Sequence, residues 1–274
     1  MTGIEQHEAR LREIGADEGR TMPLAEAALL LAALDHPGRE VAPYLRHMDE
    51  LAATLPNRQI WCAADRGDAL STVIHIDHGY GGDRDTYDDM MNANLMSVID
   101  RRKGLPVALA ILYIETARRA GWHAWGLDFP GHFVLRLDGE SDRVILDPFH
   151  AGVSVEPPAL RQLLKTYVGP DAELEQKYYD PMPDRSILLR LLNNIRGRAL
   201  QSGNNARGLQ IMQRMLLVAP GDPRLWLESA ALQAKTGQLK GAREAAETCL
   251  VLKPEVMLKQ QAEKLLETLR RDLN

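Results

Sequence analysis

His132 and Asp147 are the residues of this chain whose types and spacing could support chemistry. Each lies at one end of a segment that predicts a β-hairpin, with Phe133 after the histidine and Pro148 after the aspartate. In a cysteine-type acyl-transfer site, a His and an Asp stand on adjacent strands, and the Cys opens a nearby helix. The His would take the proton from the thiol, and the Asp would orient the imidazole.

The helix start that such a site requires is present, but it lacks a nucleophile. A strongly apolar helix is predicted to open after Gly104, so the attacking residue would stand at Pro106, Val107 or Ala108. No Cys, Ser or Thr occurs between Gly104 and Ala110. The nucleophile position is therefore unoccupied, and the first question is whether this chain is an enzyme.

The two cysteines of the chain do not supply the missing thiol in our interpretation. Cys62 lies among apolar neighbours, which predicts a buried structural cysteine, and Cys249 lies in the core of a predicted repeat helix. Two cysteines far apart in sequence predict neither a disulfide framework nor a zinc site, and they fit a reducing cytoplasm.

Two patterns resemble metal sites, and we interpret neither as one. His75 and His78 flank Asp77, but no third ligand pattern accompanies them, so we expect exposed loop residues. The acidic stretch from Asp83 to Asp89 lacks the Gly at the sixth and the Glu at the twelfth position of a calcium loop. We therefore expect no metal and no cofactor.

The helix from Leu105 to Ala120 should form the centre of the fold. Pro106 suits its first turn, Gly121 ends it, and the run from Val107 to Ile114 is apolar on all sides, which predicts complete burial. The other elements are predicted from apolar spacing and turn residues. Helices are expected at 24–34, 44–55 and 92–101, strands at 124–129, 133–137 and 143–146, a turn-rich loop at 79–83, and a helix or strand at 70–76.

Register decides whether the hairpin can form a site. Closing it places His132 and Asp147 roughly opposite each other, whereas a slip of one residue would turn them to opposite faces of the sheet.

The C-terminal part of the chain carries an internal repeat. Gly203 and Gly237 are 34 residues apart, as are Pro220 and Pro254. This period, with helix–turn–helix content and a terminal Pro, is typical of tetratricopeptide repeats. A last helix, about Val256–Leu273, should cap the stack.

Charge and hydropathy exclude several classes of protein. The net charge is −5, the pI is near 5.9, and no basic run of five or more occurs, so we expect no nucleic-acid partner. No apolar run approaches the roughly 18 residues of a membrane span, and the N-terminus does not read as a signal peptide. We expect a cytoplasmic protein without membrane contact.

The ordered motifs resemble a known family. They run from Gly79-Tyr80-Gly81-Gly82 through Asn94 to Pro106, then Pro130 to Phe133, then Leu146 to Phe149. Together with the repeat, they are similar to the SirB-type bacterial proteins, which join a transglutaminase-like domain to tetratricopeptide repeats. The resemblance implies an α+β, papain-like core, in which a central buried helix packs on a small antiparallel sheet with helices before it. It also implies a pocket rim at Asn94, Asp100, Arg102, Gly104 and Gly131. From the sequence itself, Asp100 and Arg102 could equally form an ion pair at a helix end.

The resulting organisation has three parts. Residues 1–20 are expected to be a loose leader or an edge helix, 21–180 the transglutaminase-like domain, and 184–274 the helical repeats. Our leading hypothesis is a non-catalytic protein that binds a partner protein or peptide through its repeats and through the cleft at His132 and Asp147. In this hypothesis the two residues pin two strands together. One alternative is an amide hydrolase or acyl transferase that uses this dyad with an unrecognised nucleophile or a water. Another is a regulatory protein that acts through a protein partner.

Overall fold

The chain folds into two compact units. The computed structural model describes residues 2–17, 19, 21–56 and 60–272. The first unit has Thr21–Leu191 as its main segment, and the second combines most of helix α1 (Gly3–Ala16) with the chain from Leu192 onward. The boundary falls within helix α8 (Asp184–Gln201), a few residues after the break that we placed at 180–184.

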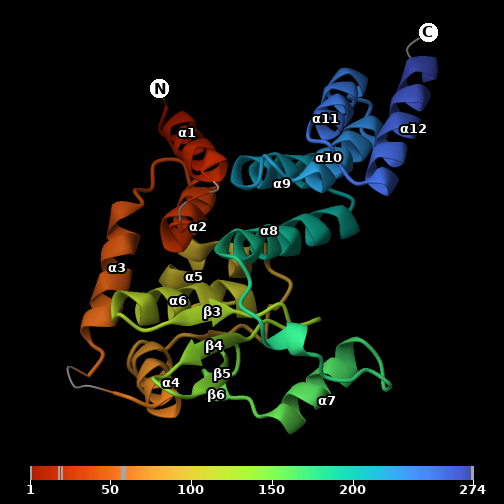
Figure 1. Cartoon of the computed structure of the whole chain (residues 1–274). Coiled ribbons are helices and arrows are strands. Elements are labelled where there is room, and N and C mark those ends of the chain that lie inside the picture. The colour runs from red at the N-terminus through yellow and green to blue at the C-terminus, as the bar shows by residue number, and fades with distance from the viewer. Residues whose placement is uncertain (1, 18, 20, 57–59, 273–274) are drawn as a thin grey trace. The chain divides into compact units, whose positions relative to one another are not determined.

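Helix α6 (Pro106–Arg119) is the centre of the first unit (Figure 1). Every residue from Pro106 to Ile114 is buried, and the first half-buried position is Glu115. Pro106 stands at the start of the helix, where its missing N–H leaves no helical hydrogen bond unmade. The prediction of a fully buried central helix is therefore confirmed.

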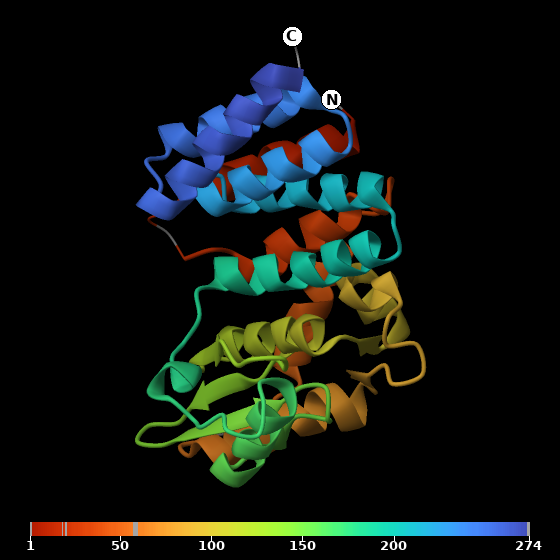
Figure 2. The same ribbon diagram turned by 90° about the vertical axis from the view of Figure 1, so that its right-hand side faces the viewer.

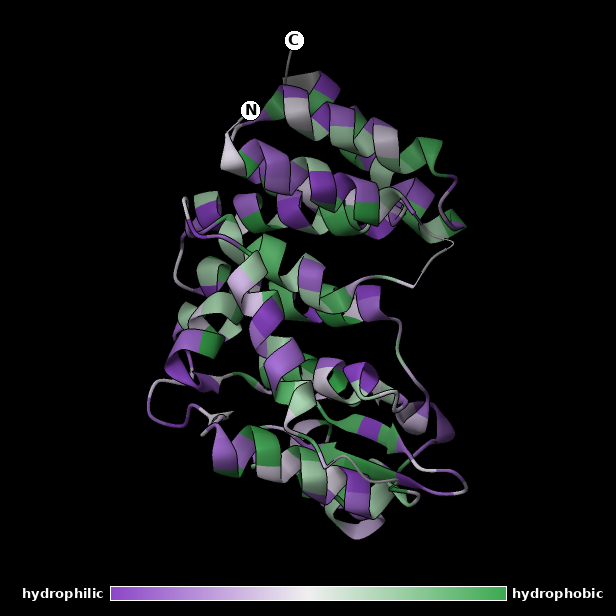
Figure 3. Ribbon diagram, turned by 90° about the vertical axis from the view of Figure 1, so that its left-hand side faces the viewer, coloured by the Kyte–Doolittle hydropathy of each residue, from purple (hydrophilic) through white to green (hydrophobic). Residues whose placement is uncertain are grey.

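A four-stranded antiparallel sheet packs against α6 through its first strand. The strands follow chain order and are β3 (Ala124–Gly126), β4 (Leu135–Asp138), β5 (Arg143–Asp147) and β6 (Val153–Ser154). Leu135 and Leu137 of β4 are buried while Arg136 between them is half-buried, as the pleat requires. In Figure 3 the strands are largely green, the colour of hydrophobic residues. The α+β class and the helix-on-sheet core are as expected.

The strand predicted over 124–129 is shorter than expected, because the chain leaves the sheet after Gly126. Leu127 instead forms an isolated bridge with Pro181. The undecided segment 70–76 is helical: helix α4 (Ala63–Ser71) continues into a π-helical turn, Thr72–Asp77. The remaining helices of the unit are α2 (Leu24–Ala33), α3 (Ala42–Ala53), α5 (Leu95–Arg101) and α7 (Pro157–Tyr167), with 3-10 turns at Met90–Ala93 and Gln176–Tyr179.

A second, two-stranded sheet lies just before α6. Within the turn-rich stretch that we predicted, β1 (Gly81–Gly82) pairs in parallel with β2 (Lys103–Gly104). Each strand has two residues, too few for a periodic signal. This pairing ties residues 81–82 to the segment that leads into α6.

The second unit is helical throughout its described part (Figure 2). Figure 3 shows purple and green side by side along its helices, as expected of amphipathic helices that bury one face. The side chain of Cys249 is fully buried, as predicted. The repeat helices are α9 (Asn205–Val218), α10 (Pro223–Lys235), α11 (Leu239–Val251) and α12 (Val256–Asp272). Leu273, the predicted end of the last helix, lies outside the described residues.

Helix α1 corresponds to the edge helix that was one of the two expectations for this segment, not to the loose leader. Leu11 is fully buried and Ile14 nearly so. A side chain at Gly15 would lie 1.9 Å from the backbone oxygen of Leu217 in α9, so only a glycine permits this close approach. The low apolar content of residues 1–20 hid this packing, because two buried positions and one glycine suffice to dock the helix.

Candidate functional site

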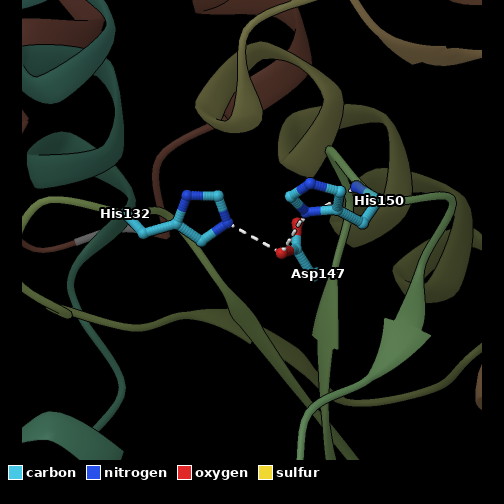
Figure 4. A group of neighbouring side chains, drawn as sticks. All are labelled: His132, Asp147 and His150. Carbon is cyan, nitrogen blue, oxygen red and sulfur yellow. Dashed lines mark hydrogen bonds and ion pairs between the residues drawn. The ribbon is translucent and has the colours of Figure 1, made fainter. Parts of the chain in front are cut away.

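The structure brings His132 and Asp147 into direct contact. The Nε2 atom of His132 lies 2.8 Å from Oδ2 of Asp147 (Figure 4), and the two residues are only 7% and 4% exposed. His132 lies in the loop before β4 and Asp147 ends β5. The observed register, with Leu135 opposite Leu146, puts both residues at the same end of the hairpin.

Backbone hydrogen bonds fix both residues. Oδ1 of Asp147 accepts from the backbone N–H groups of Phe149, at 3.0 Å, and His150, at 3.2 Å. The Arg190 guanidinium donates to the carbonyl oxygens of Phe129 and His132, each at 2.8 Å. The loop that carries His132 is therefore held at both ends.

His150 is a third member of the site, and the sequence alone did not predict it. Its Nδ1 atom lies 2.8 Å from the same Oδ2 atom of Asp147, and its side chain is 44% exposed. Figure 4 shows the two imidazoles on opposite sides of the carboxylate. The spacing Asp147-x-x-His150 was the available signal, and it becomes meaningful only once His132 is known to be adjacent.

Two imidazoles hold this carboxylate in its charged form. Burial alone would raise the pKa of Asp147, but hydrogen bonds and charge interactions with His132 and then His150 outweigh burial and lower the pKa. The site therefore presents one ionised, acceptor-only oxygen between two ring nitrogens near neutral pH.

The start of α6 lies beside this site but offers no nucleophile. The Phe149 carbonyl accepts a hydrogen bond of 3.2 Å from the Gly82 N–H, and Gly82 pairs with Gly104, two residues before α6. Pro106, Val107 and Ala108 are all buried and carry no thiol or hydroxyl. Among the described residues, none forms a hydrogen bond with Nδ1 of His132, the nitrogen that would receive the nucleophile's proton.

Cys62 does not enter the site, and its predicted burial was wrong. The residue is half-buried and forms the N-cap of α4, where its Sγ accepts from the Asp65 N–H at 3.4 Å. Ser, Thr, Asp and Asn are the usual residues at this position, so an apolar neighbourhood in sequence gave no indication of a cap.

The five residues expected at the pocket rim lie in three different places. Gly131 precedes His132 and adopts φ of +72°, and Gly104 lies in β2 just before α6. Asn94 instead caps α5 and donates to the Ala32 carbonyl at 3.1 Å, so this buried side chain serves the fold.

Asp100 and Arg102 belong to a different cluster. Asp100 pairs with Arg39 at 2.5 Å, and Arg102 stacks over the Tyr80 ring and contacts His47. Among the described residues, neither contacts His132 or Asp147.

Residues from both sequence patterns that resemble metal sites make hydrogen bonds or ion pairs within the protein. His75 and His78 each place Nδ1 against a backbone carbonyl, at 2.7 and 2.8 Å respectively. They lie on or next to the π-helical turn, not in a loop. Asp83 is buried and binds Arg101 at 3.0 Å, so the acidic stretch is anchored at its first residue.

Comparison with known proteins identifies the fold. A family model described as the transglutaminase-like superfamily matches residues 31–193. The chain belongs to this superfamily. A tetratricopeptide repeat model matches residues 195–270. Transglutaminase-like and repeat domains in this order are those of the SirB-type family, which the sequence motifs indicated.

Relatives of this transglutaminase-like protein occur in several bacteria. A UPF0162 protein of Xylella fastidiosa is 29% identical over 86% of both chains. A UPF0162 protein of Pseudomonas aeruginosa is 34% identical over 72% of both chains. Protein SirB1 of Salmonella typhimurium is 22% identical over 78% of this chain and 80% of its own. No solved structure matches.

The two domains together point to protein interaction. Tetratricopeptide repeats commonly mediate contacts between proteins, and their stacked helices present extended surfaces for this purpose. Within the described part of this superfamily member, no helix combines the length and the hydropathy needed to cross a bilayer.

Proposed function

We propose that this protein is a non-catalytic member of the transglutaminase-like superfamily that binds a partner protein or peptide through its repeats and its cleft. The observation that carries the proposal is the start of α6, where buried Pro106, Val107 and Ala108 replace the nucleophile. Without a thiol, the His132–Asp147 pair has no proton to take up for acyl transfer, and its hydrogen bond joins the loop before β4 to the end of β5.

The proposal extends to the setting in which the protein works. The unpaired cysteines Cys62 and Cys249 suit the cytoplasm. The net charge of −5 makes a protein partner a better expectation than a nucleic acid.

An activity assay tests the catalytic half. Purified protein is given a glutamine-containing protein and a fluorescent amine, and both amine incorporation and ammonia release are followed beside an active transglutaminase. We expect neither product. Turnover that disappears in His132→Ala, at an unchanged melting temperature, would overturn the proposal.

A crosslinking assay tests the binding half. A photoreactive residue replaces Val251, which is 76% exposed in the repeat unit, or Ile76, which is 71% exposed in the first unit. We expect the photoreactive residue at position 251 to give one discrete crosslinked species between the protein and its partner. An excess of protein without the photoreactive residue should compete this species away. Equal crosslinking from both positions, or none from Val251, contradicts binding through the repeats.

One observation favours a second candidate, hydrolysis by an activated water. Nδ1 of His132 is not used by any described residue, and the ionised Asp147 fixes Nε2 as the bonded nitrogen. A base so oriented could deprotonate water. The same assay separates the two functions, because this candidate predicts ammonia release without amine incorporation.

A further inference from the structure

Three potential metal-ligand atoms converge at the end of β5. One ligand atom each from His132, Asp147 and His150 lies within 4.8 Å of the others. Nε2 of His132 and Nδ1 of His150 are each 2.8 Å from Oδ2 of Asp147. Two imidazoles and one carboxylate are a donor set that zinc and similar divalent ions accept.

We propose that His132, Asp147 and His150 bind one divalent transition-metal ion of the zinc class. The two buried residues form the inner wall of this site, and the exposed His150 closes it on the solvent side. Three protein ligands leave a fourth tetrahedral position for water or another ligand. This inference goes beyond partner binding and does not depend on it.

The distances suit such an ion after a small adjustment. Zinc lies 2.0–2.2 Å from nitrogen and oxygen ligands, so tetrahedral ligand atoms are roughly 3.3 Å apart. The present nitrogen–oxygen separations of 2.8 Å need to widen by about half an ångström, and the two ligand nitrogens, which lie within 4.8 Å of each other, must come to the same spacing. In the metal-free site, Nε2 of His132 and Nδ1 of His150 carry the protons that they donate to the ionised carboxylate. When the ion binds, each proton moves through solvent to the other nitrogen of the same ring, so none is gained or lost overall.

The surroundings hold the ligands in place before an ion arrives. Backbone N–H groups occupy Oδ1 of Asp147, which leaves Oδ2, the atom that both imidazoles contact, as the ligand atom. Tyr167 stacks against the His132 ring at 6.4 Å between centroids and 11° between planes. In metal sites, contacts from surrounding residues orient the side chains that bind the ion. His75 and His78 lack this arrangement, because backbone carbonyls occupy their Nδ1 atoms.

Cobalt titration tests the site directly. Untagged protein is stripped with a chelator and titrated with Co²⁺, whose visible absorption reports tetrahedral nitrogen and oxygen ligands, and Zn²⁺ is then added as a competitor. We expect one Co²⁺ per chain, displaced by one Zn²⁺. His150→Ala should weaken binding by more than about tenfold, since even outer contacts contribute 10–100-fold.

Matched variants make the outcome decisive. His123→Ala removes an exposed histidine outside the site and should bind like the wild type. Asp147→Asn keeps the size of the buried ligand and should also lose binding, with circular dichroism checking that it folds. Absence of tetrahedral cobalt absorption, or equal affinity in His150→Ala and His123→Ala, overturns the proposal. The crosslinking assay is run without metal, so its result is independent.

Discussion

The Tyr167 ring lies nearly parallel to the His132 imidazole, 6.4 Å away between centroids. Tyr167 ends helix α7 and is 53% exposed, whereas His132 beneath it is 7% exposed. The approach requires a glycine at position 131, because a Cβ there would lie 2.2 Å from the tyrosine ring and φ is +72°. One half-exposed aromatic residue therefore covers the candidate site.

Removing that cover should make His132 reactive. In Tyr167→Ala we expect the imidazole to react with diethyl pyrocarbonate several times faster than in the wild type, because one ring face becomes solvent-accessible. Mass spectrometry of the peptide that contains His132 measures the rate. Val168→Ala, at the next exposed residue, is the control. Equal rates in all three proteins would show that Tyr167 does not shield the ring.

Asp147 should be important for stability whatever the function. Asp147→Ala leaves two imidazoles and two backbone N–H groups without their acceptor, and we expect a loss of about 2–4 kcal/mol in the free energy of unfolding. Urea denaturation measures it. The exposed His150→Ala should cost less than about 1 kcal/mol. A similar small loss for both variants would contradict a structural role of the carboxylate.

Asp83 should make the protein sensitive to acid. Burial raises its pKa, but hydrogen bonds from the Thr86 side chain and backbone prevail and bring it from 3.8 to about 2. Because the folded-state pKa is the lower one, this stabilisation is complete above about pH 4 and disappears as the pH falls through 2. Allowing for screening by solvent, the charge should contribute on the order of 1–2 kcal/mol.

The comparison variant for this pH dependence is Asp83→Asn. The difference in unfolding free energy between wild type and variant should shrink between about pH 4 and pH 2. Denaturation series at several pH values give this difference. A constant difference over that range would mean that the carboxylate's charge contributes nothing.

Gly15 should be intolerant of even a methyl group. Ala is favoured over Gly in a helix by about 1 kcal/mol. Here the methyl group would lie 1.9 Å from the Leu217 carbonyl oxygen, a backbone atom that cannot rotate away. Overpacking costs about 1–3 kcal/mol, so Gly15→Ala should be net destabilising. Faster hydrogen exchange in α1, relative to a Gly3→Ala control at an open position, would confirm it; a raised melting temperature would contradict it.

A cysteine at the start of α6 should become an acidic thiol. Helix N-termini stabilise thiolates, so Pro106→Cys should have a pKa below the ordinary value of about 8.5. The control is Ala120→Cys, at the other end of the same helix. Ultraviolet absorption of the thiolate, followed against pH in a Cys62→Ser background, measures both. Equal pKa values for the two introduced thiols would show that the start of α6 does not favour a thiolate, as the helix start of a cysteine-type acyl-transfer site does.

Long patterns predicted the architecture, and the reason is physical. The apolar run from Val107 to Ile114 has only one stable location, the interior, so α6 was predicted almost to its ends. The hairpin followed from two short apolar segments and its turn, and the repeats followed from their period. Each of these signals is local in sequence or regular.

Features that depend on one distant partner were not predictable. His150 gains its role only through His132, 18 positions earlier, and Cys62 caps a helix through a single contact. Helix α1 docks through Gly15, whose partner lies two hundred residues away. None of these contacts produces a periodic pattern in the amino-acid sequence.

The frame around the site is held by main-chain contacts. Gly82 joins the turn after Asp147 to the segment before α6 through a backbone hydrogen bond and a strand pair. No side chain at the nucleophile position takes part in that link. A thiol introduced at Pro106 therefore leaves every hydrogen bond of that link in place, so the backbone that would have to position a nucleophile is already built without one.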